Sequence, residues 1–163
     1  QESANDPCAL EALRARTNAR SILLNADGKI ETLELLLQKH VQDRILIFTF
    51  SNELVYRISE LFLIPAITHQ TKAIERKWIL DRFRLGQFSV LATSRVLNEG
   101  IDIAAANVAI ILSGSASSIE HLQRLGRILR KREDKDAVLY ELVTTATQES
   151  SISYRRRQSD AYR

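Results

Sequence analysis

The stretch RILIFTFSNELVYRISELFLIPAIT, residues 44–68, decides the fold because it contains a strand, a helix and a second strand in succession. Residues 44–50 form a short, almost continuous apolar run rich in Ile and Phe, which is typical of a strand covered on both faces. Ser51 and Asn52 suit a helix N-cap, and apolar residues then recur at helical spacing up to residue 63. Residues 64–68 offer the second strand, so the stretch indicates one unit of an α/β sheet.

The same alternation continues on both sides of this unit. Helical spacing predicts further helices over residues 29–40, 72–86 and 118–131, with Gly86 as a stop signal. Buried apolar runs predict further strands over residues 87–93, 106–113 and 137–144. Strands that are too apolar to have a wet face require helices on both sides of a mostly parallel sheet. The sequence therefore predicts a doubly wound α/β domain.

Length and composition restrict the class of protein. A chain of 163 residues with 45% hydrophobic and 26% charged residues has the size and balance of one folded domain. The lone Cys8 excludes an internal disulfide and favours a reducing compartment. No apolar run is long enough to cross a bilayer, so we expect no membrane partner. We expect a cytoplasmic, nucleoid-associated protein in a prokaryote, or a nuclear one in a eukaryote.

The loops after the strands are the expected ligand-binding segments, because ligands of such sheets lie outside the carboxyl ends of the strands. Ser51 and Asn52 follow the first strand, and Thr93 and Ser94 follow the third. Their hydroxyl and N–H groups suit phosphate oxygens, although Ser51 and Asn52 also suit simple helix capping. In the segment ATSRVLNEGIDI, residues 92–103, Gly100 permits a positive φ and Asp102 can accept hydrogen bonds from hydroxyls such as a ribose.

The expected helix over residues 118–131 carries a stripe of polar and basic side chains. On a helical wheel Gln123, Arg127 and Arg130 fall within roughly 60° of one another, while leucines and isoleucines occupy the other side. Gly126 lies beside this stripe and allows a bulky group to approach the helix. Guanidinium groups grip phosphate oxygens in two places, so the stripe favours phosphate binding. The alternative is that these side chains form an ordinary solvated basic face of the helix. We expect this of Arg124, which flanks the stripe.

Other kinds of site find little support in the sequence. The three histidines are scattered without carboxylates or cysteines at ligand spacing, so we expect no metal site. No G-x-S-x-G elbow is present, which argues against nucleophilic hydrolase chemistry. No G-x-x-x-x-G-K-[ST] phosphate loop occurs either. We therefore expect that this chain does not cradle a nucleotide by itself.

Three segments, in this order, resemble a known family. ILIFTFS at residues 45–51, VLATSRVLNEGID at residues 90–102 and QRLGRILR at residues 123–130 resemble motifs IV, V and VI in the second RecA-like domain of superfamily 2 helicases. The run SGSASSIEHLQRLGRILR, residues 113–130, looks most like XPB-type repair and transcription helicases. The likeness covers roughly residues 44–143, and the Q-x-x-G-R-x-x-R frame is its most specific part.

The resemblance implies ATP-dependent DNA translocation, with ATP and Mg²⁺ held mainly by a first RecA-like domain that this sequence lacks. It implies that Arg127 and Arg130 act as arginine fingers and that Gln123 positions the nucleotide or the attacking water. Residues implied to serve the nucleotide site are Gly100, Asp102 and Gly126. Residues implied to contact the backbone of one DNA strand are Ser51, Asn52, Thr93, Ser94 and Arg95.

The expected organisation has three parts. Residues 1–40 form a lead-in with the first helices, residues 41–146 form the RecA-like core, and residues 147–163 form a basic polar tail or helix. We expect the chain to be part of a larger or split helicase and to be inactive alone, with the P-loop domain, DNA and a nuclease or a repair or transcription factor as partners. The competing hypothesis is a non-catalytic RecA-like module that binds DNA or a protein.

Overall fold

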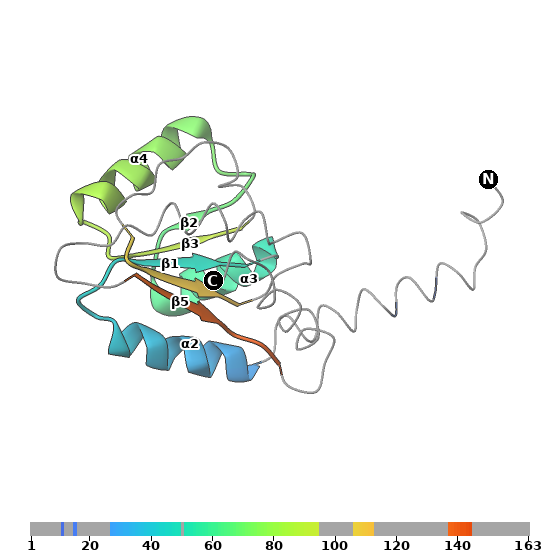
Figure 1. The fold of residues 1–163 in the computed structure, drawn as a ribbon. Helices are drawn as coiled ribbons and strands as arrows, with labels where there is room; N and C mark the ends of the chain where they lie inside the picture. The colour runs from blue at the N-terminus through green and yellow to red at the C-terminus, as the bar shows by residue number, and fades with distance from the viewer. Residues whose placement is uncertain are drawn as a thin grey trace, which may run out of the picture.

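A computed structural model describes residues 27–49, 51–94, 106–112 and 137–144, together with Glu11 and Ala15. The strands form one five-stranded parallel sheet in the order β2-β3-β1-β4-β5 (Figure 1). Its strands are β1 (Ile45–Phe48), β2 (Ala66–Ile67), β3 (Val90–Thr93), β4 (Val108–Ile111) and β5 (Val138–Glu141). The helices described in full are α2 (Asp27–Lys39), α3 (Asn52–Phe62) and α4 (Ala73–Leu85).

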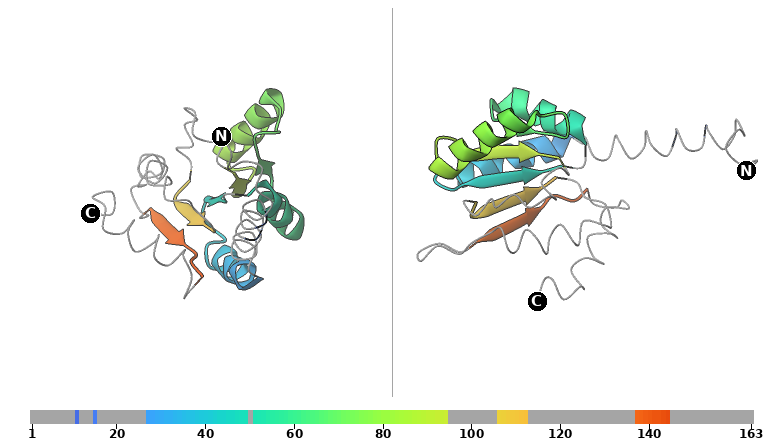
Figure 2. Two further views of the ribbon diagram at one scale, coloured as in Figure 1. Left: turned by 90° about the vertical axis from the view of Figure 1, so that its right-hand side faces the viewer. Right: turned by 90° about the horizontal axis from the view of Figure 1, so that it is seen from above.

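The central strands β1 and β4 are buried on both faces, as their composition predicts. Leu46 and Phe48 of β1 pack in a cluster with Leu80 and Phe83 of α4. The alternate residues of β1 pack in a second cluster with α2 and α3, whose buried members include Leu33. Figure 2 shows α4 on one face of the sheet and α2 and α3 on the other. The prediction of a doubly wound α/β sheet is therefore confirmed.

Two helix ends follow the local signals in the sequence. Ser51 adopts an extended conformation as the N-cap of α3, and its side chain accepts a hydrogen bond from Leu54 N. Gly86 ends α4 with φ of 78°, and its N–H donates to carbonyl oxygens in the last turn. Such a left-handed end favours glycine, because a Cβ strains this conformation. The predicted stop at Gly86 is confirmed.

The N-terminal side of the described chain differs in one detail from the pattern in the sequence. Residues 25–29 look like a turn, yet α2 begins at Asp27. Hydrophobic periodicity marks the body of a helix but not the residue at which it begins, because the N–H groups of the first turn have no partner within the helix. Leu33 of α2 is fully buried against β1 and β4, so this helix packs as a layer of the sheet. The helix predicted over residues 118–131 lies outside the described residues.

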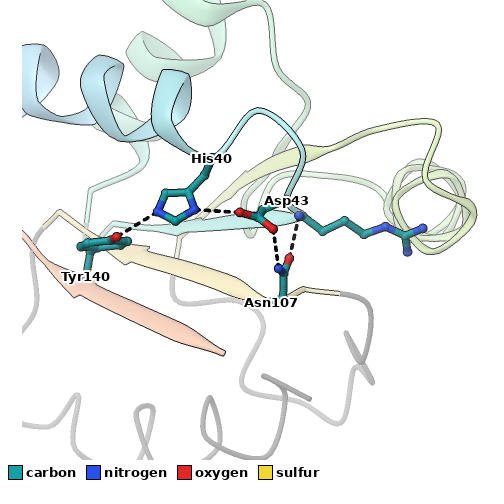
Figure 3. A network of polar contacts seen from close by, with 5 residues as sticks. His40, Asp43, Asn107 and Tyr140 are labelled. Carbon is teal, nitrogen blue, oxygen red and sulfur yellow. Dashed lines mark hydrogen bonds and ion pairs between the residues drawn. The ribbon is translucent and has the colours of Figure 1, made fainter. Parts of the chain in front are cut away.

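A network of partly buried polar groups ties the amino edge of the sheet to the end of α2 (Figure 3). His40 Nδ1 donates to Asp43 Oδ2 and His40 Nε2 lies on the hydroxyl of Tyr140, both at 2.8 Å. Asn107 Nδ2 donates to Asp43 Oδ1 at 2.7 Å, and Arg44 N donates to Asn107 Oδ1 at 2.8 Å. These bonds join α2, β1, β4 and β5 and satisfy one another's donors and acceptors.

In the part of the chain that the structure describes, no helix has the length and apolar character needed to cross a bilayer. The longest described helices, α2 and α4, have 13 residues each.

Candidate nucleic-acid interface at the carboxyl edge of the sheet

The loop after β1 brings hydroxyl and amide groups to the carboxyl edge of the sheet. Thr49 Oγ1 donates to Ser51 O at 2.6 Å, which fixes the backbone just before α3. Ser51 and Asn52 are partly exposed at the N-terminus of α3. The N-terminus of a helix carries partial positive charge and directs N–H groups outward, so this end of α3 suits an anion.

The turn after β2 is held by hydrogen bonds between its own residues. Thr68 N donates to Thr71 Oγ1 at 2.9 Å, and Gln70 N donates to Thr68 Oγ1 at 3.2 Å. The Tyr56 hydroxyl of α3 lies 2.8 Å from Thr68 Oγ1 and donates to Gln70 Oε1 at 3.0 Å. Arg76 Nη2 of α4 donates to Thr68 O at 3.5 Å, which adds a cation to this turn.

One exposed contact joins the loops after β1 and β2, although β3 lies between the two strands. Asn52 Nδ2 donates to His69 Nδ1 at 2.8 Å. Asn52 begins α3 after β1, and His69 lies in the turn after β2. The contact therefore bridges two polar loops across the end of β3.

The end of β3 lies beneath this bridge. Thr49 N donates to Thr93 O at 3.0 Å, and Ser94 N donates to Ile67 O at 3.2 Å. Thr93 has no exposed surface and Ser94 is 3% exposed. The Thr93 hydroxyl donates to Ser94 O at 2.9 Å. The backbone of this segment is therefore tied to both neighbouring strands.

The predicted site residues divide into two groups. Ser51, Asn52, Thr93 and Ser94 come together at the carboxyl edge, because β1 and β3 pair with Phe48 opposite Thr93. Their contact with DNA stays a prediction. The remaining predicted site residues lie outside the described residues: Arg95, Gly100, Asp102, Gln123, Gly126, Arg127 and Arg130.

The loop after β2 belongs to the expected ligand-binding segments, but the sequence pattern assigns no site role to His69 in it or to Tyr56 beside it. The available signal was positional, because residues 68–72 directly follow a strand, where ligands of such sheets bind. Their hydrogen bonds to α3 depend on the strand order, which the sequence pattern does not contain.

The described residues were also compared with the ligand sets that metal ions require. Within the described ranges, no three His, Cys, Asp or Glu side chains gather as a candidate metal site. Mg²⁺ requires oxygen ligands, usually carboxylates together with the substrate's phosphates. The described carboxyl edge therefore offers hydroxyl, amide and imidazole groups for an anion rather than a carboxylate cluster for a cation.

Comparison with known proteins identifies the family. Residues 28–132 match the family described as helicase conserved C-terminal domain. The chain is 43% identical over 156 residues to the DNA 3'-5' translocase XPB2 of Sulfurisphaera tokodaii, covering 96% of this chain and 35% of that protein. It is 34% identical over 117 residues to the DNA 3'-5' helicase XPB of Mycobacterium tuberculosis, covering 71% of this chain and 21% of that protein.

The fold has a close counterpart among solved structures. The C-terminal domain of the DEAD-box protein Dbp5 superposes with a TM-score of 0.69 at 20% identity, covering 82% of this chain and 79% of that domain. This likeness confirms the predicted RecA-like fold. The chain spans only 35% and 21% of the length of the two XPB relatives. From its match over residues 28–132, the chain belongs to the helicase conserved C-terminal domain family, and its relatives make it a domain of the XPB type.

Proposed function

We propose that this chain is the C-terminal motor domain of an ATP-dependent DNA helicase or translocase. The observation that carries the proposal is the 43% identity, over 96% of the chain, to a protein named as a DNA 3'-5' translocase. The matched family region, residues 28–132, contains all three motifs of the sequence resemblance. On this proposal the chain supplies one side of the ATP site and part of the DNA path, and a first RecA-like domain supplies the other side.

The proposed DNA contacts lie at Ser51, Asn52, Thr93, Ser94 and Arg95. Because Thr93 and Ser94 are buried, their side chains support the end of β3 rather than touch DNA themselves. Pairing between β1 and β3 supports this assignment, because it brings the first four of these residues to one edge. The N-terminus of α3 and the partly exposed Asn52 side chain are suited to phosphate oxygens. Such contacts read the backbone rather than the bases, so binding is insensitive to sequence and weakens as salt rises.

The proposed nucleotide contacts are made by Gln123, Arg127 and Arg130, with Gly100, Asp102 and Gly126 close to the same site. ATP with Mg²⁺ is held mainly by the first RecA-like domain, because this sequence has no phosphate loop. Arg127 and Arg130 stabilise charge on the transferred phosphoryl group. Gln123 orients the nucleotide or the attacking water. Alone, the chain binds DNA weakly and does not hydrolyse ATP.

The proposed setting is the chromosome, in the nucleoid-containing cytoplasm of a prokaryote or in the nucleus of a eukaryote. One plant relative is named as a subunit of general transcription and DNA repair factor IIH, which supports a repair or transcription factor as partner. A nuclease is the other proposed partner, since strand separation exposes single strands that a nuclease can cut.

The test compares the 163-residue chain with the enzyme that combines it with a P-loop RecA-like domain. DNA-stimulated ATP hydrolysis is expected only in the two-domain enzyme. In that enzyme, Arg127→Ala should lower kcat roughly a thousandfold, because an arginine finger acts only on the transition state. Nucleotide affinity should change little. Arg124→Ala is the matched control, because Arg124 lies on the flank of the stripe and should leave kcat unchanged.

Two results would overturn parts of the proposal. Unchanged turnover in Arg127→Ala removes the finger assignment. A two-domain enzyme that binds DNA tightly but shows no DNA-stimulated ATP hydrolysis favours the non-catalytic binding module instead.

A further inference from the structure

The outer side of α4 exposes a row of large apolar side chains, which we call the α4 stripe. Ile74 is 86% exposed, Trp78 48% and Leu85 73%. On a helix these three positions fall within roughly 40° of one another. Ile79 and Phe83, on the opposite side of the helix, are buried against the sheet. Single exposed apolar residues are ordinary, but a row of them along one helix face points to an interaction site.

The indole of Trp78 is held in a fixed orientation within this stripe. The Arg82 guanidinium lies over the ring, with Cζ 3.7 Å from the ring centroid. The Phe88 ring packs against the same indole, with centroids 5.8 Å apart. Phe88 packs in turn against a core cluster, which anchors the indole to the domain. An ordered aromatic side chain loses little freedom on binding, and Trp and Arg often dominate the binding energy of protein interfaces.

The borders of the stripe are basic. Five basic and two acidic residues lie on α4 and its N-cap: Lys72, Arg76, Lys77, Arg82, Arg84, Glu75 and Asp81. Asp81 pairs with Arg84 at 3.2 Å. Among the described residues, no carboxylate lies within ion-pair distance of Lys77 or Arg82. These two cations border the stripe on either side, so carboxylates of a partner would complement both.

We propose that the α4 stripe docks an amphipathic helix of another protein, which places apolar side chains on the stripe and carboxylates beside Lys77 and Arg82. The stripe spans about 16 Å from Ile74 to Leu85, a length that three turns of a partner helix cover. The inference goes beyond the proposed function, because the stripe contains none of the residues assigned to ATP or DNA.

Other occupants complement this surface less well. A second copy docked through the same stripe would bring the cations of both copies together, and such like charges repel. Residues 145–163 of this chain carry four arginines and two acidic residues, so they are repelled as well. Single-stranded nucleic acid suits the positive charge, but Ile74 and Leu85 offer no ring on which a base can stack. Arg82 already covers one face of the indole.

The test uses fluorescence, because Trp78 is the only tryptophan of the chain and therefore reports on the stripe itself. Two synthetic peptides of about 18 residues serve as probes, a length that holds a helix in isolation. Both carry leucines at i, i+4, i+7 and i+11, flanked by glutamates in one peptide and by lysines in the other. The glutamate peptide should shift the Trp78 emission of the 163-residue chain to shorter wavelength. It should bind at least about tenfold more tightly than the lysine peptide.

Substitutions on both faces of the sheet complete the test. Ile74→Asp should weaken binding of the glutamate peptide at least about tenfold, because it removes an apolar contact and adds repulsion. Its Tm should be unchanged, since Ile74 is exposed. Arg82→Glu should invert the preference, so that the lysine peptide binds more tightly. Leu35→Asp is the matched control, because Leu35 is an exposed leucine of α2 on the other face, and its affinity should stay within about twofold.

Four results would overturn the inference. Equal affinity for the two peptides, or no change of emission with either, removes the docking site. A shift of emission that grows with the concentration of the chain alone, together with the mass of a dimer, assigns the stripe to a second copy. Stronger protection of Trp78 from acrylamide quenching by oligo(dT) than by the glutamate peptide assigns it to nucleic acid. If Ile74→Asp lowers the Tm, Arg82→Glu still decides, because it tests the sign of the preference. None of these measurements involves ATP hydrolysis, so the proposed function stands in every case.

Discussion

The two edges of the sheet use polar side chains in opposite ways. At the amino edge, His40, Asp43, Asn107 and Tyr140 bond to one another, and the side chains of His40 and Asp43 are only 11% and 17% exposed. At the carboxyl edge, the threonine hydroxyls of the turn after β2 bond within that turn. An exposed hydrogen bond from Asn52 to His69 joins this turn to the N-terminus of α3. The difference teaches that the first edge uses polar side chains to keep helix and strands together, whereas the second leaves polar side chains at the surface, where the proposed DNA contacts lie.

Two asparagines allow this comparison to be tested with one kind of substitution. Asn107 is 7% exposed and both ends of its amide are bonded inside the protein. Asn52 is partly exposed and donates to one imidazole nitrogen. Removing the same amide should therefore affect stability at one edge and DNA binding at the other.

The largest effect is expected from Asn107→Ala. It removes the hydrogen bonds that the Asn107 amide makes with Arg44 N and Asp43 Oδ1, and loss of these partly buried bonds costs about 2 kcal/mol. Urea denaturation should show this loss in the free energy of unfolding. DNA affinity at a temperature well below the transition should be unchanged. A stability close to that of the unsubstituted chain would remove the structural role assigned to the amino edge.

A smaller effect is expected from Tyr140→Phe, which deletes the hydroxyl beside His40 Nε2 and keeps the ring. The ring still contacts His40 edge-on, with centroids 5.3 Å apart. Loss of one hydrogen bond should lower the free energy of unfolding by about 1 kcal/mol, measured in the same urea titration. Tyr56→Phe serves as its control for DNA binding, because the Tyr56 hydroxyl supports a loop of the carboxyl edge. If Tyr140→Phe weakens DNA binding as much as Tyr56→Phe, the two edges do not differ as described.

The smallest effect is expected from Asn52→Ala. The free energy of unfolding should change by less than about 0.5 kcal/mol, since the side chain is a surface group. The Kd for DNA should rise about threefold, as expected for one hydrogen bond to a phosphate that stays exposed to water. Fluorescence anisotropy with the two-domain enzyme measures this change. Asn52→Ala is a cleaner probe than Ser51→Ala, because Ser51 also caps α3. An unaltered Kd would argue against DNA contact at this position.

Much of the fold could be predicted because its signals are local. The apolar run of β1 and the glycine at the end of α4 each depend on neighbouring residues alone. The amino-edge network could not be predicted, because His40 and Tyr140 meet across 100 residues of sequence. The Asn52–His69 contact depends on β2 lying beyond β3, which no periodicity encodes. Lys29 looked like part of a polar turn, and only the packing of α2 shows that it is buried.

The central place of β1 has a consequence for synthesis on the ribosome. Among the described strands, β1 is made first and is the middle of the sheet, and its neighbour β3 begins only at Val90. The β2-β3-β1 half can form once residue 94 has emerged, while the other edge of β1 stays open until β4 arrives. An open strand edge is a template for pairing with another chain. The pace of translation between residues 94 and 111 therefore sets how long the nascent protein is exposed to misassembly.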